Sequence, residues 1–432
     1  MIDLKLVREN PAKVREALLK RGEDVDLNIL LGLDKERRET LTEVEGLKSR
    51  RNQVSAEISG LRAENRLADV LIEEMKDVSS RIKALDLKVA EIENQIAAII
   101  DELPNLPDED VPPGGKENNE VIRTWGHKPD FDFSILDHVE LAEKLGLVDY
   151  NRGVKLGGAN FWLYKGVGAL IEWGFLNYFV ESHVQDGYEF ILPPHILRYE
   201  CGYAAGQFPK FAEDVFHIFR KDNRQEGQFL LPTAETALIN LHRDEILDEA
   251  ELPKKYFSFT PCYRKEVGSY RATERGTMRG HQFNKVEMFQ FTIPEMSDKA
   301  HIELLEKAEK LVRGLGLHYQ VTKLAAQDMS GAMAKTFDVE IWIPSLGRYT
   351  EVSSVSNARD YQARRGKIRF RRSHNRKTEF VHTLNASGLA TSRLIVGLIE
   401  QLQQADGSLV IPEVLRKWVG KEVIYPISGP IY

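Results

Sequence analysis

Side chains that could bind a charged ligand gather in two stretches, Phe259-Thr-Pro-Cys-Tyr-Arg-Lys-Glu266 and His281-Gln-Phe-Asn-Lys-Val-Glu287. The first stretch ends on a cation and a carboxylate, Arg264 and Glu266, and the second carries an aromatic ring, Phe283. An arginine fork matches phosphate oxygens, a carboxylate accepts from an amino group, and an aromatic ring stacks on a base. The combination therefore predicts a site for a polyphosphate nucleotide.

The two stretches are expected to lie on neighbouring strands. Runs of β-prone apolar residues, from Tyr256 to Cys262 and from Gln282 to Phe291, flank a loop rich in Gly, Arg, Ser and Thr. This pattern is typical of a long β-hairpin. The loop adds three more cations suited to phosphate groups, Arg271, Arg275 and Arg279.

A second polar pair lies upstream, where Phe229-Leu-Leu-Pro-Thr-Ala-Glu235 places Thr233 and Glu235 two residues apart. In an extended segment both side chains point the same way and can share one ligand. The alternative is a capping Thr-x-Glu at the start of a helix over 236–241. The sequence leaves both interpretations open.

Two further candidates lie near the C-terminal end. Gly347-Arg-Tyr-Thr-Glu-Val-Ser-Ser354 follows an alternating, strand-like run and places Glu351 close to two serines. Arg393 occurs in the first turn of an apolar helix over 391–402, where a cation is unfavourable against the helix dipole. A cation at that position indicates a bound anion.

The N-terminal part is predicted to form a long α-helical arm. Apolar residues from Met75 to Ile99 alternate in steps of three and four, which is a heptad seam, and a weaker seam runs upstream from Val44. The polar segment 63–68 separates the two, so we expect helices at about 31–64 and 69–101 to fold back as an antiparallel coiled coil. A dimerisation rod is one interpretation. The other is an RNA-binding arm whose cations follow a phosphate backbone, with candidates Lys48, Arg50, Arg51, Arg62 and Arg66.

Composition shifts suggest where the domains lie. Prolines and paired glycines between 101 and 115 mark a linker, so we predict an N-terminal domain at 1–105, a linker at 106–130 and a larger α+β domain at 131–425. Within the larger domain, an apolar helical stretch from Phe161 to Val184 leads into a short strand, expected to be buried, that ends at two prolines. Such a unit fits either a dimer interface or ordinary core packing.

Bulk properties narrow the class of protein. The 432 residues include no run of about 18 apolar residues, so we expect no membrane span. Cys201 and Cys262 are the only cysteines, which excludes a disulfide framework and favours a reducing, cytoplasmic setting. The net charge of −7 argues only weakly against binding to nucleic acid.

In this order, the segments resemble those of bacterial-type seryl-tRNA synthetases, a class II aminoacyl-tRNA synthetase family. The resemblance covers nearly the whole chain. It rests on the helical arm, Gly206-Gln-Phe-Pro-Lys-Phe211, Leu231-Pro-Thr-Ala-Glu235, Asn240-Leu-His-Arg-Asp-Glu-Ile-Leu247, the Arg264-x-Glu266 hairpin, Glu351-Val-Ser-Ser354 and His382-Thr-Leu-Asn-Ala-Ser-Gly388.

The resemblance implies an antiparallel β-sheet surrounded by helices, a homodimer, and a tRNA-binding domain that carries the arm. It also implies a serine–tRNA ligase that uses ATP and Mg²⁺, forms seryl-adenylate and pyrophosphate, and charges tRNA(Ser), as well as tRNA(Sec) where present. No zinc is expected, because the Cys-His-Glu spacing of the archaeal subtype is absent.

The resemblance also assigns roles to residues. Arg264, Glu351 and Arg393 would be catalytic, and Glu351 with Ser354 would hold Mg²⁺. The nucleotide site would comprise Arg264, Lys265, Glu266, Phe283, Glu351, Val352, Ser353, Ser354 and Arg393. The serine site would comprise Thr233, Ala234, Glu235, Arg264, Glu287, Asn385 and Ser387.

The chain departs from the family pattern in two places. Ser354-Val-Ser-Asn-Ala358 lacks the two cysteines that the family often has there, which we expect to matter little. Asn-Ala-Ser-Gly replaces Asn-Gly-Ser-Gly, and Ala386 is expected to place a methyl group near the hydroxyl pocket. Two alternatives therefore stay open: a paralogue that serves another acceptor, and a non-catalytic RNA-binding relative.

Overall fold

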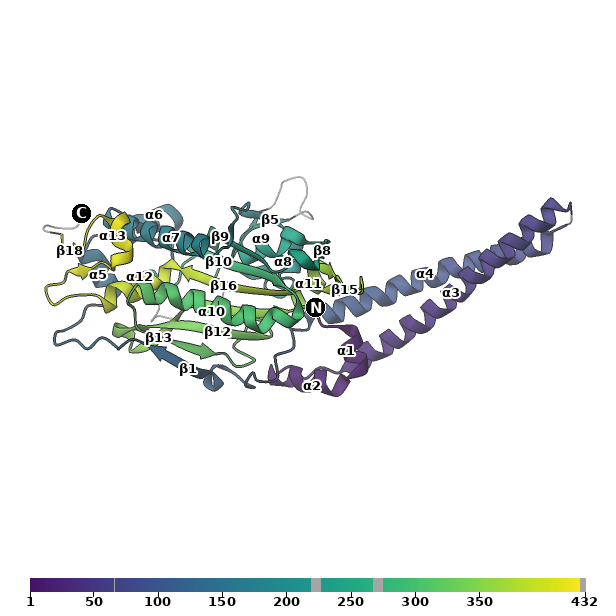
Figure 1. The fold of residues 1–432 in the computed structure, drawn as a ribbon, viewed down its shortest axis with the longest axis horizontal. Helices are drawn as coiled ribbons and strands as arrows, with labels where there is room; N and C mark the ends of the chain where they lie inside the picture. Colours follow the sequence, from purple (N-terminus) through teal and green to yellow (C-terminus); the bar gives the residue numbers. More distant parts are fainter. Residues whose placement is uncertain (66, 219–226, 267–274, 428–432) are drawn as a thin grey trace. The chain divides into compact units, whose positions relative to one another are not determined.

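The structure, a computed structural model, describes residues 1–65, 67–218, 227–266 and 275–427 (Figure 1). Two of the predicted cations, Arg66 and Arg271, lie outside these residues. The chain divides into two compact units. One comprises Ile2–Leu19 and Glu23–Pro104, and the other comprises Met1, Lys20–Gly22 and Asn105–Tyr432.

The smaller unit is built on two long antiparallel helices, α3 (Leu27–Ala63) and α4 (Asp69–Glu102), after the short helices α1 (Leu4–Glu9) and α2 (Pro11–Lys20) (Figure 1). The apolar seam of α4 is buried or half-buried at every predicted position from Met75 to Ile99. Ion pairs join the two helices in antiparallel order, for example Arg37 to Glu93 at 3.1 Å. The predicted hairpin arm is therefore confirmed, with bounds close to those expected.

The larger unit is organised around an eight-stranded sheet. All neighbouring strands pair antiparallel except β4 and β9, which run parallel. In spatial order the strands are β1 (Glu120–Trp125), β11 (Tyr319–Lys323), β12 (Lys335–Ile343), β13 (Arg348–Arg359), β16 (His382–Ala390), β10 (Gln282–Thr292), β9 (Lys254–Tyr263) and β4 (Glu189–Phe190). This sheet confirms the predicted α+β class, and β9 with β10 confirms the predicted hairpin.

Helices and small sheets surround this central sheet. The helices are α5 (His138–Lys144), α6 (Tyr150–Gly157), α7 (Val167–Gln185), α8 (Tyr199–Ala204), α9 (Glu235–Leu238), α10 (Ser297–Gly314), α11 (Tyr361–Gly366), α12 (Thr391–Gln401) and α13 (Glu413–Val419). The small sheets pair β2 (Val148–Asp149) with β3 (Leu163–Tyr164), β5 (Ile196–Arg198) with β7 (Gln228–Leu230) and β6 (His217–Ile218), β14 (Arg369–Arg371) with β8 (Ile246–Asp248) and β15 (Thr378–Phe380), and β17 (Leu409–Val410) with β18 (Val423–Ile424).

The central strands separate the site from the main core. Residues directly opposite each other in antiparallel strands point to the same face of a sheet. Met288, Val355 and Ala386 are paired in this way and belong to the largest apolar cluster, to which α10 and α12 contribute. Glu287 and Ser387, one residue along, pair on the opposite face. A one-residue alternation therefore places polar side chains toward the site and apolar ones toward the core.

The segment predicted as a linker, 106–130, is not a free connection. It contains β1, which is the end strand of the central sheet. Before this strand, the backbone N–H of Asp108 donates to the carbonyl of Ala334 at 2.9 Å, and Val111 is buried against Leu324 and Met329. The sequence signal came from prolines and glycines, which limit helices but do not prevent a chain from packing on a sheet edge.

The short strand β4 was expected to be buried, and this prediction is wrong. Both of its residues, Glu189 and Phe190, are exposed, because β4 lies at the end of the sheet beside β9. The helix before it is shorter than predicted and begins at Val167. Within the described residues, no helix combines the length and the apolar character needed to cross a bilayer.

Candidate active site

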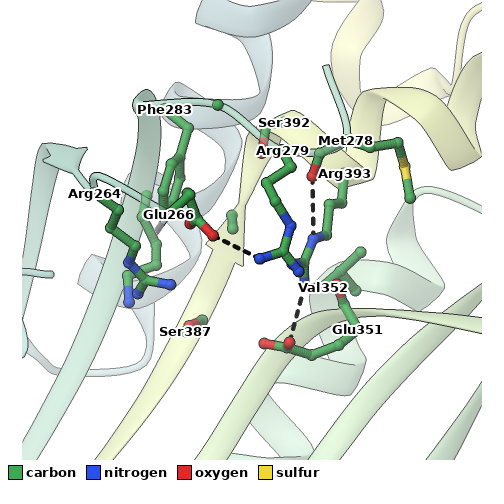
Figure 2. A pocket seen from close by; sticks show the side chains of 13 residues that line it. Arg264, Glu266, Met278, Arg279, Phe283, Glu351, Val352, Ser387, Ser392 and Arg393 are labelled. Atoms are coloured by element: carbon green, nitrogen blue, oxygen red, sulfur yellow. Dashed lines mark hydrogen bonds and ion pairs between the residues drawn. The ribbon is translucent and has the colours of Figure 1, made fainter. Parts of the chain in front are cut away.

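A pocket with an empty volume of about 520 Å³ opens where β9, β10 and β13 meet the start of α12 (Figure 2). Its wall includes six of the predicted nucleotide-binding residues: Arg264, Glu266, Phe283, Glu351, Val352 and Arg393. It also includes Met278, Arg279, Gly280, Lys285, Ser387, Ala390 and Ser392. The fold thus brings together residues that are up to 129 positions apart in the sequence, the separation between Arg264 and Arg393.

The hairpin holds one side of this pocket. Arg264 follows directly after β9, and its Nε donates to the carbonyl of Pro232 at 3.2 Å. Its guanidinium carbon lies 5.3 Å from the centre of the Phe283 ring, within the range of a cation–π interaction. Glu266 accepts from Nη1 of Arg279 at 2.6 Å. The predicted cation, ring and carboxylate therefore line one wall, and Arg279 reaches them from the loop.

The opposite side of the pocket is an ion pair between Arg393 and Glu351 (Figure 2). Nη1 of Arg393 lies 2.9 Å from a carboxylate oxygen of Glu351, and Nε donates to the carbonyl of Met278 at 3.4 Å. The depth of the pocket would by itself raise the pKa of Glu351. The positive charges of Arg393 and Arg264 outweigh this effect and lower the pKa below its ordinary value. Glu351 is therefore held as an anion.

Three of the predicted nucleotide residues do not line the pocket. Lys265 donates its backbone N–H to the carbonyl of Asp214 at 2.9 Å. Ser353 is fully buried, and its hydroxyl donates to the carbonyl of Ser387 at 2.5 Å. Ser354 lies directly opposite Asp338 on β12, just before a bulge between Val339 and Glu340 that shifts the register so that Glu351 lies opposite Glu340.

Asp338 is a buried carboxylate that sequence reasoning did not single out. Burial, followed by the negative charge of Glu351, raises the pKa of Asp338, and the hydroxyl of Ser354 donates to it. One of its oxygens has no hydrogen-bond partner among the described residues. The alternation of apolar and polar residues around 337–343 predicts a half-buried strand. Such a strand is expected to carry polar residues on one face, so the pattern alone does not assign Asp338 to the site.

A second pocket adjoins the first and shares Arg264 and Glu266 with it. Thr233 lines this second pocket, together with Gln207 and Ser330. Glu235 is the first residue of α9, so the capping interpretation is correct in placing it at the start of a helix. The backbone N–H of Glu235 donates to Oγ1 of Thr233 at 3.3 Å. Its carboxylate does not turn back to cap the helix.

The carboxylate of Glu235 instead joins a buried polar cluster. Gln362 donates to one of its oxygens at 2.7 Å, and Nδ2 of Asn385 lies 3.4 Å from the other. The same amide donates to Glu287 at 3.0 Å, and the hydroxyl of Ser387 lies 3.4 Å from Glu287. Two carboxylates thus face one amide inside the protein.

Lys285 balances part of this negative charge. Its Nζ lies 2.6 Å from an oxygen of Glu287, and the side chains of both residues are almost completely buried. Burial, followed by the negative charge of Glu287, raises the pKa of Glu235 to about 7. The alternation of β10 places Lys285 and Glu287 on one face, a signal that could have identified the lysine from sequence. Gln362 comes from α11, and no local pattern connects it to the cluster.

The side chain of Ala234 is fully buried in an apolar cluster with Leu238 and Phe289, so only its backbone could contact a ligand. Oδ1 of Asn385, by contrast, is buried and has no hydrogen-bond partner within the described ranges. It is therefore an acceptor available to a small polar ligand.

The expectation that Ala386 lies near the hydroxyl pocket is wrong. Its side chain points to the opposite face of β16, where it pairs with Met288 and Val355 in the main apolar cluster. Asn385 and Ser387, on either side of it, face the cluster of carboxylates. Val355 and Ala358, at the positions where the family often has cysteine, are likewise completely buried.

The cations predicted on the arm differ in their surroundings. Lys48 pairs with Asp86 at 3.0 Å and Arg50 with Glu74 at 3.2 Å, so both are partly used to join α3 to α4. Arg51 is half-buried and Arg62 is exposed. Because exposed ion pairs are weak, typically below about 1 kcal/mol, a phosphate backbone could displace them.

Comparisons with known proteins agree with this geometry. Residues 1–107 match the family described as seryl-tRNA synthetase N-terminal domain, and residues 216–402 match the class II core domain of the G, H, P, S and T tRNA synthetases. Serine--tRNA ligase 2 of Clostridium acetobutylicum is 59% identical over 98% of this chain and 100% of its own length. Serine--tRNA ligase of Thermodesulfovibrio yellowstonii is 44% identical over 98% and 100%.

A solved structure is similar over the same extent. The seryl-tRNA synthetase of Pyrococcus horikoshii, whose crystal structure is a complex with ATP, is 33% identical to this chain. The two superpose with a TM-score of 0.92 over 99% of this chain and 100% of the other. With its helical arm, its antiparallel catalytic sheet and full-length relatives well above 30% identity, this chain belongs to the seryl-tRNA synthetase family.

Proposed function

We propose that the protein is a serine–tRNA ligase that activates L-serine with ATP and transfers the seryl group to tRNA(Ser), and to tRNA(Sec) where present. One observation carries the proposal: Arg264 lines both the nucleotide pocket and the adjoining pocket that contains Thr233. A single guanidinium can donate in two directions, which lysine cannot do. Arg264 can thus bridge the carboxylate of serine and the α-phosphate of ATP.

Activation then needs positioning and charge neutralisation rather than an acid–base pair. The serine carboxylate is already an anion, and it attacks the α-phosphorus while the bond to pyrophosphate breaks. Arg264 stabilises the charge that develops at phosphorus, and Arg393 holds the γ-phosphate. Phe283 stacks on adenine, and Glu266 accepts from its amino group once Arg279 has released it.

The residues beside Arg393 fit a magnesium ion. Mg²⁺ prefers oxygen ligands, and Glu351 and Ser354 on β13 both carry side-chain oxygens. Asp338 lies directly opposite Ser354 on β12, and one of its carboxylate oxygens has no hydrogen-bond partner among the described residues. Glu351 and Ser354 would hold the ion with the phosphates. When bound, Mg²⁺ would neutralise charge on the phosphates and on the departing pyrophosphate. Glu351 would then exchange its contact with Arg393 for one with the metal.

Serine recognition is assigned to the buried cluster. Thr233 and Glu235 bind the α-ammonium, while Glu287, Asn385 and Ser387 surround the side-chain hydroxyl. A site built to satisfy this hydroxyl leaves buried polar groups unpaired when alanine enters.

The first prediction concerns this selectivity. In Glu287→Gln, the preference for serine over alanine, as a ratio of kcat/KM in ATP–pyrophosphate exchange, is expected to fall by at least about tenfold, because one charged hydrogen bond to the hydroxyl is lost. Glutamine keeps the shape of the side chain and avoids a cavity beside Lys285. Exchange with alanine is the matched control and should change little. An undiminished preference for serine in the variant would contradict the assignment.

The second prediction concerns pH. The carboxyl of Glu235, with a pKa of about 7, is largely neutral at pH 6 and ionised at pH 8. A neutral carboxyl binds an ammonium ion poorly, so the KM for serine is expected to rise by up to about tenfold for each pH unit below 7. Glu235→Gln should bind serine weakly and lose this dependence. The KM for ATP serves as the control; if the KM for serine stays flat between pH 8 and 6, Glu235 does not bind the ammonium.

The proposal extends to assembly and location. Leu170, Trp173 and Val184 on α7 and Phe190 on β4 are all exposed apolar side chains. Together they favour a homodimer interface over internal packing for this part of the chain. A cytoplasmic location also remains part of the proposal.

Serine-dependent exchange between ATP and pyrophosphate tests the activation step, and charging of tRNA(Ser) tests the transfer step. Exchange without charging would favour the paralogue with another acceptor. Absence of both, from folded protein that still binds tRNA, would favour the non-catalytic relative. A non-catalytic relative would not need to keep the residues that bind the nucleotide. In this chain four of them line the pocket: Arg264, Phe283, Glu351 and Arg393.

A further inference from the structure

A buried carboxylate that none of these roles uses lies behind the nucleotide pocket. Glu172, on α7, is only 6% exposed. One of its oxygens accepts from Nδ2 of Asn284 at 2.8 Å and from the hydroxyl of Thr391 at 2.6 Å. Its other oxygen has no hydrogen-bond partner in the part of the chain that the structure describes. The interactions of this carboxylate are therefore directed at two residues from two other elements.

Both partners lie within two residues of proposed nucleotide-binding residues. Asn284 follows Phe283 on β10, so the position of its side chain bears on the backbone that carries the stacking ring. Thr391 is the first residue of α12, and Arg393 is the third. The Thr391 hydroxyl also lies 3.1 Å from the carbonyl of Asn284, which joins β10 and α12 directly.

Burying the carboxylate of Glu172 costs free energy of folding, so its presence is better explained by the elements that it aligns than by stability. Burial raises the pKa of Glu172 to about 7, against the effect of its two hydrogen bonds. An apolar side chain of similar volume often replaces a buried charged group without loss of stability. Glu172 is thus poorly explained as a stabilising residue, while its contacts fit the alignment of three elements.

We propose that Glu172 is a positioning residue that ties α7 to β10 and α12 and so fixes the relative placement of Phe283 and Arg393. These two residues hold opposite ends of the nucleotide, the adenine ring and the γ-phosphate. A shift of about 1 Å between such groups can cost about a hundredfold in rate. The proposal rests on the nucleotide site proposed above, and it adds a residue that does not touch the substrate.

The same helix also faces outward. Leu170 and Trp173, which flank Glu172 in sequence, are exposed apolar side chains on α7. Glu172 therefore connects a surface suited to another copy of the chain with the nucleotide pocket.

The test compares Glu172→Ala with Glu172→Gln in serine-dependent ATP–pyrophosphate exchange. Alanine removes both hydrogen bonds, so the KM for ATP is expected to rise about tenfold, with less than about a twofold change in the KM for serine. Glutamine keeps an oxygen that can accept from both partners, and it should restore the KM for ATP to within about twofold. A general loss of stability would instead lower the active fraction without separating the two KM values.

Glu309→Ala provides the matched control. Glu309 is as deeply buried, but it bonds to Arg123, Arg313 and Tyr319, away from the nucleotide pocket. This variant should lose thermal stability and keep the KM for ATP. A double-mutant cycle with Thr391→Val adds a second measurement, because the effects of Glu172→Ala and Thr391→Val on this KM should be less than additive.

The outcomes separate the two proposals. If the unmodified protein shows no serine-dependent exchange, the proposed function fails. If the unmodified protein exchanges and Glu172→Ala has an unchanged KM for ATP, the positioning role alone is overturned. Equal increases in the KM values for ATP and serine, or fully additive effects with Thr391→Val, would also overturn it.

Discussion

Replacing Arg264 with alanine is expected to reduce serine-dependent ATP–pyrophosphate exchange by about 100- to 1000-fold, or roughly 2.7–4 kcal/mol of transition-state stabilisation. The reason is its position between the two pockets, where it would cancel the repulsion between the serine carboxylate and the α-phosphate. Most of the loss should appear in kcat, because this charge is largest at the transition state. Initial-rate exchange measurements at saturating ATP and serine provide the test.

Arg264→Lys is the informative control. Lysine keeps the positive charge but cannot donate in two directions, so we expect a rate well below that of the unmodified protein. Circular dichroism should show that both variants remain folded, since the guanidinium lines the two pockets and its Nε donates to the backbone carbonyl of Pro232. Exchange within about fivefold of the unmodified protein in Arg264→Ala would refute the assigned role.

Removing the arm should separate the two chemical steps. Deletion of 40–96, with a short Gly/Ser connection in its place, is expected to leave amino-acid activation unchanged within about twofold and to lower tRNA charging by at least about a hundredfold. The residues that line the two pockets all lie beyond residue 206, so none of them is removed. Exchange and charging, measured on one preparation, give the comparison.

A charge-reversal variant tests the same point without shortening the chain. Arg51→Glu combined with Arg62→Glu leaves the ion pairs of Lys48 and Arg50 with α4 in place. Charging should fall, and the fall should diminish at high salt, because phosphate contacts are salt-dependent. Normal charging by the deletion variant would mean that the arm does not bind the RNA.

The predictable parts of this molecule are those encoded by local patterns. The seam from Met75 to Ile99 predicts a coiled coil because apolar residues recur in alternating steps of three and four along the whole helix. The hairpin from Tyr256 to Phe291 is similarly local. Arg264, Glu266 and Phe283 could therefore be placed together from the sequence, since the register of one hairpin determines where they meet.

Other features depended on packing that no short pattern records. Gln362 reaches Glu235 from a helix more than a hundred residues later, and Glu172 reaches Thr391 across 219 positions. The error at Ala386 has a different origin. Its neighbours in sequence, Asn385 and Ser387, suggested a shared pocket, whereas alternation along β16 directs the methyl group to the opposite face. Because successive side chains of a strand point to opposite faces, a residue next to Asn385 and Ser387 in sequence does not share their pocket.

The ion pairs in the nucleotide pocket have a consequence for turnover. Arg393 is held by Glu351 and Arg279 by Glu266, so two of the groups that would meet the nucleotide are already neutralised by carboxylates of the same wall (Figure 2). In the proposed site ATP would have to displace these carboxylates from the arginines, and a lone phosphate, which can contact fewer of the cations at once, would compete poorly with them. After pyrophosphate forms, the same carboxylates are in place to recapture the arginines. If the proposed function holds, Glu351 and Glu266 would compete with the bound product for these two arginines, which would limit product retention and favour the next round of binding.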